Sequence, residues 1–150
     1  MARTRRKATG HRGAAPRLAL DADDAFVAVL IAAMEASDHV SADEAARAHD
    51  LIWATRRFRH RSGEAVGRRI ERVRTLFRQQ GVSPLVEAAA RALPARLRPA
   101  AFAIAADIVL VDGRLERAEG RFLAELARQL RLEAKTARRI RDVIRIKNSA

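Results

Sequence analysis

Apolar residues recur along most of this chain with the period of an α-helix. Between residues 64 and 79 they fall at Val66, Ile70, Val73 and Phe77, and mainly arginines and glutamates fill the positions between them. Such a spacing places the apolar side chains on one face of a helix. Six further segments carry comparable helical signals: 23–34, 41–58, 83–93, 98–111, 115–130 and 133–147. The pattern predicts an all-α fold, a single compact bundle of about seven helices.

Residues that favour helix ends support these boundaries. Ser41 and Glu44 form the S-x-x-E pattern of a capping box, and Pro84 and Pro99 each suit the first turn of a helix. The apolar positions of 98–111 surround the helix axis, which predicts that this helix is the central one. In the last predicted helix, the inward positions are expected to be Ile140, Val143 and Ile144.

Several charged clusters beside these helices have an ordinary structural interpretation. Asp21, Asp23 and Asp24 precede the apolar part of the first helix, where carboxylates interact favourably with the helix dipole. The basic run 56–61 crosses the predicted end of the second helix, where cations offset the opposite end of the dipole, although it could also grip a phosphate. The arginines of 64–79 are expected to form a solvated face.

An acidic turn joins the fifth and sixth predicted helices. Asp112 and Gly113 end the fifth helix, because glycine readily adopts positive φ and aspartate tolerates a turn. Glu116 and Glu119 follow, and Asp107 lies five positions before the turn. Such carboxylates offer oxygen ligands that suit Ca²⁺, Mg²⁺ or Mn²⁺. In a purely structural interpretation, the same residues only terminate one helix and stabilise the start of the next.

A weaker copy of this turn occurs earlier in the chain, where residues 36–44 align with residues 111–119. Each segment follows an apolar helix, and Glu44 corresponds to Glu119. The earlier copy is degenerate, because Asp38 stands where the later copy has glycine. The alignment predicts a degenerate internal helix-turn-helix repeat whose two units superpose.

With these residues the chain resembles the TerB-like domain, that is, the tellurite resistance protein TerB and its relatives. The matching positions are Asp112, Gly113, Leu115, Glu119, Phe122, Leu123, Leu126 and Leu130. As a layout of helices the resemblance covers residues 21–147. It implies an all-helical domain of roughly seven helices, an acidic surface proposed to bind metal ions, and no established catalytic reaction. The candidate metal ligands are Asp112, Glu116, Glu119, Asp107, Asp38 and Glu44.

Composition limits the other classes of function. A chain of 150 residues suits one domain, expected at 21–150 after a disordered basic tail at 1–20. The absence of cysteine excludes disulfides, thiolate metal sites and thiol-based reduction within this chain. No Ser/His/Asp arrangement, glycine-rich phosphate loop or H-E-x-x-H motif occurs, so the chain is not expected to be an enzyme. Without an apolar run of about 18 residues or a secretory signal, the expected location is the bacterial cytoplasm.

The net charge of +12 leaves a second function open. The first hypothesis is a non-enzymatic stress-response or tellurite-resistance module that binds a divalent cation and acts as a scaffold for other proteins of a stress-response complex. The alternative is a nucleic-acid-binding protein that uses the basic tail and the arginine-rich helix faces. The tail could also contact an anionic membrane. Of the 30 basic residues, 27 are arginine, a bias that a genome's base composition can also produce.

Overall fold

The computed structural model describes residues 18–36 and 42–149, except for the side chains of residues 42–45 and 47. Most of the predicted basic tail lies outside this part. The described residues form seven α-helices and one short 3₁₀ helix, with no β-strand, which confirms the all-α prediction. The elements are α1 (Ala22–Ala36), α2 (Ala42–Ala54), α3 (Gly63–Gln80), α4 (Val82–Ala92), η1 (Ala95–Leu97), α5 (Arg98–Val109), α6 (Arg117–Gln129) and α7 (Ala134–Lys147).

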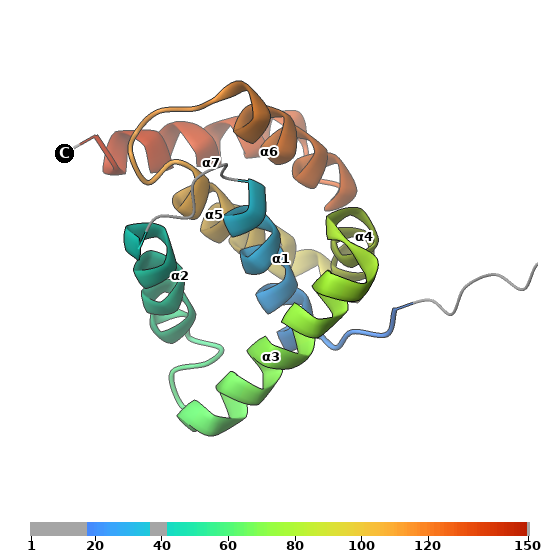
Figure 1. The fold of residues 1–150 in the computed structure, drawn as a ribbon. Coiled ribbons are helices and arrows are strands. Elements are labelled where there is room, and N and C mark those ends of the chain that lie inside the picture. Colours follow the sequence, from blue (N-terminus) through green and yellow to red (C-terminus); the bar gives the residue numbers. More distant parts are fainter. Residues whose placement is uncertain (1–17, 37–41, 150) are drawn as a thin grey trace, which may run out of the picture.

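Helix α1 runs through the middle of the bundle, where it contacts α2, α3, α4, α5 and α6 (Figure 1). Every residue from 23 to 33 is buried. Its apolar run FVAVLIAAM explains this burial, because a helix that is apolar on all sides is stable only when it is surrounded. The sequence pattern predicted α5 as the central helix, but α1 is enclosed more completely, because Ala103 and Ile104 of α5 are only partly buried.

Helix α5 forms the second layer of the core and packs on α1, α6 and α7. Phe102 and Ile108 are fully buried on it, and Ala105 and Ala106 let neighbouring helices approach closely. Helix α7 packs mainly on α5 and therefore buries only a narrow stripe. The prediction that Val143 points inward is wrong, because this side chain is 63% exposed while Ile140 and Ile144 pack against the core.

The predicted end of the second helix at Phe58 is also wrong, because α2 ends at Ala54. The chain then turns back, and the N–H of Phe58 donates to the carbonyl of Thr55 at 2.9 Å. The hydroxyl of Thr55 donates to the carbonyl of Leu51 at 2.6 Å. These turns place Phe58, which is 1% exposed, in the core, and they carry the following arginines past the start of α1.

Within the described residues, no helix is long and apolar enough to cross a membrane.

Helices α3 and α4 each begin one residue before the predicted segments 64–79 and 83–93. Ser62 caps α3 by accepting a hydrogen bond from the N–H of Ala65 at 3.2 Å, whereas α4 begins after Gly81, which has a φ of +82°. Glycine is favoured at position 81, because a residue with a side chain would strain the backbone at this φ.

Candidate functional site

The acidic turn between α5 and α6 has the backbone geometry that its sequence predicts. Gly113 has a φ of +74°, and its N–H donates to the carbonyl of Leu110 at 3.0 Å. The side chain of Asp112 accepts a hydrogen bond from the N–H of Arg114 at 2.9 Å. A Cβ atom on Gly113 would lie 3.4 Å from the carbonyl oxygen of Asn148, so the turn also packs closely against the end of α7. Asp112 and Gly113 therefore have structural roles.

The two glutamates after the turn form the start of α6. Glu116 is the N-cap residue and forms a capping box with Glu119, whose Oε2 accepts a hydrogen bond from the N–H of Glu116 at 2.9 Å. Such a bond satisfies a backbone donor that the helix itself leaves unpaired. Glu119 is 7% exposed, whereas the side chains of Asp112 and Glu116 face solvent. This turn therefore contains one buried carboxylate and two exposed ones.

Asp107 connects the turn to the last helix. It lies on α5 and is 4% exposed, and its two carboxylate oxygens are 2.7 and 2.6 Å from Nζ of Lys147. Nδ2 of Asn148 donates to Asp107 at 3.1 Å and to the carbonyl of Leu110 at 2.9 Å. The carboxylate of Asp107 thus ties the end of α7 to α5 and holds the adjacent turn in place.

The two candidate ligands from the weaker copy are less defined. Asp38 lies outside the described residues, and Glu44 lies in the first turn of α2, where its side chain is not described. The end of α1, the start of α2 and the acidic turn all lie at the same end of the bundle (Figure 1). Among the residues that the structure describes, no three Asp, Glu or His side chains are grouped to hold a metal ion. The α5–α6 turn by itself therefore does not make a complete metal site.

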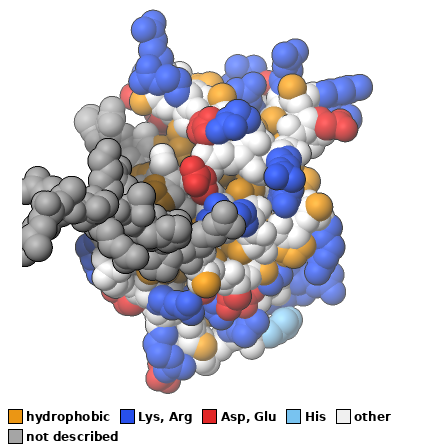
Figure 2. Space-filling view, turned by 90° about the vertical axis from the view of Figure 1, so that its right-hand side faces the viewer, with side chains coloured by type: hydrophobic (Ala, Val, Ile, Leu, Met, Phe, Trp, Pro, Cys, Tyr) orange, Lys and Arg blue, Asp and Glu red, His pale blue; other side chains and the backbone are white. Residues whose placement is uncertain are grey.

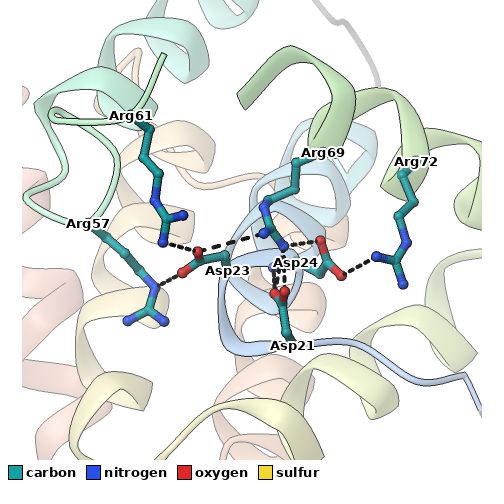
Figure 3. Close-up of polar contacts among 7 residues, drawn as sticks. All are labelled: Asp21, Asp23, Asp24, Arg57, Arg61, Arg69 and Arg72. Carbon is teal, nitrogen blue, oxygen red and sulfur yellow. Dashed lines mark hydrogen bonds and ion pairs between the residues drawn. The ribbon is translucent and has the colours of Figure 1, made fainter. Parts of the chain in front are cut away.

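A network of charges that the sequence pattern did not predict lies at the opposite end of α1, shown in Figure 3. Asp21, Asp23 and Asp24 approach four arginines there, and the side chains of Asp23 and Asp24 are only 8% and 1% exposed. The four arginines are Arg57, Arg61, Arg69 and Arg72. Buried charges are costly unless they are paired, so these ion pairs make the burial of α1 possible.

Asp23 is paired by the segment that follows α2. Nε of Arg57 donates to one of its carboxylate oxygens, and Nη2 of Arg61 donates to the other at 2.8 Å. The guanidinium carbon of Arg57 also lies 5.7 Å from the centre of the Phe26 ring, a cation–π distance. The basic run after α2 therefore anchors its segment to the start of α1, beyond any role in offsetting a helix dipole.

Asp21 and Asp24 are bridged by Arg69 of α3. Nη1 of Arg69 donates to both oxygens of Asp21, at 2.6 and 2.8 Å, and to Oδ1 of Asp24. Oδ2 of Asp24 lies 3.3 Å from Nη1 of Arg72, close enough for an ion pair but not aligned for a hydrogen bond. Asp21 also accepts from the N–H of Asp24 at 2.7 Å and so caps α1.

The surroundings of Asp21 shift its pKa in opposing directions. Partial burial raises the pKa, but the hydrogen bond from Arg69, the backbone hydrogen bonds from Asp24 and Asp23, and the positive charge of Arg69 together outweigh burial. The net result is a pKa below the ordinary value of 3.8. Asp21 is therefore more readily ionised in the folded protein.

The fold and these contacts define a class of protein, an all-α module with an acidic helix-turn-helix at one end and an ion-paired central helix. The family model described as tellurite resistance protein TerB matches residues 23–142, and the chain belongs to this family. No curated protein and no solved structure matches the chain.

The network predicts unequal effects of two neighbouring arginine substitutions. Replacing Arg69 with Met should lower the free energy of unfolding by about 3 kcal/mol, because it leaves Asp24 buried with its charge poorly compensated. Replacing Arg68 with Met should cost no more than about 1 kcal/mol, because Arg68 and its partner Glu64 are both exposed. Urea unfolding at pH 7 measures both, and equal losses would contradict the network's role.

The lowered pKa of Asp21 predicts how its contribution changes with pH. A group whose pKa is lowered by folding stabilises the folded state above its unfolded pKa, and this stabilisation is lost as pH falls through the folded pKa. The stability difference between wild type and Asp21→Asn should therefore be constant from pH 7 to pH 5 and shrink below about pH 4. Urea unfolding across this range measures it, and a difference that persists unchanged at pH 2 would oppose the assignment.

Proposed function

We propose that the chain is a non-catalytic TerB module that binds a divalent cation between two turns at one end of the bundle. The ligands would be Asp112, Glu116 and Glu119 from the α5–α6 turn and Asp38 and Glu44 from the α1–α2 connection. Carboxylate oxygens are the ligands that Ca²⁺, Mg²⁺ and Mn²⁺ prefer. Two turns are needed because the described carboxylates of the α5–α6 turn are too few to enclose an ion.

The observation that carries this proposal is the fixed geometry of the α5–α6 turn. Asp112 and Glu116 are exposed on a backbone that is held by the positive φ of Gly113 and by the pairing of Asp107 with Lys147. A rigid turn presents its carboxylates without a large loss of entropy on binding. We assign Asp107 a positioning role, because an ion could be bound by its carboxylate only after Lys147 had been displaced.

Binding of a divalent cation should raise the melting temperature of the wild-type protein. Neighbouring carboxylates repel each other, so an ion that relieves the repulsion binds the folded state preferentially and stabilises it by mass action. Asp112→Asn should abolish the rise, and Glu119→Gln and Glu44→Gln should reduce it. Thermal melts with Ca²⁺, Mg²⁺ or Mn²⁺ against a chelator measure these effects.

The matched control is Glu125→Gln, because Glu125 lies near the far end of α6 and pairs with Arg128 there. This variant should keep the full metal-dependent rise, whatever its own stability. The proposal fails if none of the three ions changes the melting temperature of the wild type. A loss in Asp112→Asn without any effect of Glu44→Gln would restrict the site to the α5–α6 turn.

We also propose that the module acts in tellurite resistance or a related stress response by contacting another protein of a stress-response complex. The family description gives the context. Exposed large apolar side chains of the described part support a protein contact: Leu115 beside the acidic turn, and Val143 and Ile146 on α7. Val143 and Ile146 lie three positions apart on α7 and therefore share one face, and exposed apolar side chains that lie together are typical of interaction sites.

A second candidate function is nucleic-acid binding, which the net charge of +12 favours. Figure 2 shows Lys and Arg side chains over much of one face, separated by apolar and acidic side chains. Such a distribution supports contacts to a phosphate backbone more than the reading of bases.

If this second function is correct, affinity for DNA should fall steeply with salt, because each neutralised phosphate releases condensed counterions. Deleting residues 2–19, which carry six basic residues and no acidic one, should then remove most of the binding. Gel-shift titrations at two salt concentrations measure both effects. The absence of a shift at low salt would exclude this function.

A further inference from the structure

A basic cleft of about 580 Å³ lies where the end of α6 meets α4 and the start of α5. This is the opposite end of the α5–α6 pair from the acidic turn (Figure 1). Four arginines and a single carboxylate, that of Glu87, line the cleft. The arginines are Arg91, Arg98, Arg128 and Arg131. Neither the acidic turn nor the ion pairs at the start of α1 involve these side chains.

We propose that this cleft binds a small ligand that carries two or more adjacent phosphate groups. Guanidinium groups are planar and always charged, and they bind phosphate oxygens through paired hydrogen bonds. Several guanidinium groups around one cleft therefore match a ligand whose negative charges are close together. The volume of the cleft lies within the range of small-molecule sites.

Arg98 is held at the start of α5, where an anion is favoured. Its Nε donates to the carbonyl of Leu93 at 3.1 Å and so also satisfies the end of α4. The 12 residues of α5 begin at Arg98, and Pro99 occupies the first turn. The positive end of the α5 dipole and the guanidinium group of Arg98 therefore act in the same region of the cleft.

Arg131 has an unusual backbone conformation, with a φ of +54°, the only positive φ of a non-glycine residue in the described part. Its N–H donates to the carbonyl of Arg128, and the N–H of Leu132 donates to that of Ala127, both at 3.0 Å. This is the left-handed position after a helix that glycine usually occupies. Arginine adopts this conformation at a cost that glycine would avoid. The side chain of Arg131 lines the cleft and contributes a positive charge to it.

The other two arginines already have carboxylate partners. Arg128 donates to Glu125 at 2.9 and 2.5 Å, and the hydrogen bonds from Arg128 and Gln129 lower the pKa of Glu125 to about 2. Glu125 is therefore ionised at neutral pH and balances much of the charge of Arg128. Nη1 of Arg91 lies 3.9 Å from a carboxylate oxygen of Glu87, a weaker pairing. Because Arg128 and Arg91 have these partners, Arg98 and Arg131 are the principal ligand-binding residues of the proposed site.

Substituting Arg131 with Gly separates ligand binding from folding. Glycine removes the guanidinium group and relieves the backbone strain, so Arg131→Gly should melt no lower than wild type. Its affinity for pyrophosphate should nevertheless fall about tenfold, because at least one charge-assisted hydrogen bond is lost. Arg98→Gln should weaken binding to a similar extent. Isothermal titration of the full chain with pyrophosphate, in the presence of a chelator, measures these affinities independently of any divalent cation.

The matched control is Arg139→Gln, which removes the same charge from an exposed position of α7 outside the cleft. It should bind pyrophosphate as wild type does, and so should Asp112→Asn, which separates this site from the metal proposal. Equal losses in Arg139→Gln and Arg131→Gly would show general charge attraction and overturn the proposal. Failure of the wild type to bind pyrophosphate would also overturn it.

A competition experiment distinguishes binding of a small ligand from binding of nucleic acid. A single-stranded oligonucleotide, at the same phosphate concentration as pyrophosphate, should compete poorly for the cleft. If the oligonucleotide instead displaces pyrophosphate at much lower phosphate concentration, and its own binding is lost in Arg131→Gly, then the cleft belongs to a nucleic-acid interface. That result would overturn the assignment of a small ligand.

Discussion

The burial of α1 at its charged start constrains the rest of this fold. Five helices pack around α1, yet its first turn contains Asp23 and Asp24, whose carboxylates are almost inaccessible to solvent. An unpaired carboxylate would make this burial unfavourable by several kcal/mol. Arginines from α3 and from the segment after α2 therefore have to reach the same point, which fixes how both elements pass α1. Electrostatic pairing and apolar packing thus determine one arrangement together.

The features that depend on nearby residues could be predicted from the sequence. The helical periodicity gave the number and order of the helices, and the Asp112-Gly113 pair gave the turn with its positive φ. The structural interpretation, in which Glu116 and Glu119 stabilise the start of the next helix, agrees with the capping box that they form. The end of α2 was predicted too late, since helical propensity continues past Ala54 and only the burial of Phe58 in the core decides that the chain turns.

Features that depend on distant residues could not be predicted. Arg69 meets Asp21 across 48 positions of the chain, and nothing in the pattern of 64–79 distinguishes it from its solvated neighbours. The cluster of three aspartates directly before an apolar run was the available signal, because a helix that is apolar all round must bury its ends as well. The cleft is equally non-local, since α4, α5 and α6 each contribute arginines that are ordinary surface residues in isolation.

Helix α6 separates the acidic turn from the arginine-lined cleft by its whole length. Its 13 residues span about 20 Å, more than twice the Debye length of about 8 Å at physiological ionic strength. A charge bound at one end would therefore be screened before its field reached the other end through solvent. The remaining connection between the two ends is α6 itself, which packs on α5. Charges at the acidic turn and at the cleft are therefore screened from each other through solvent, although one continuous helix joins the two regions.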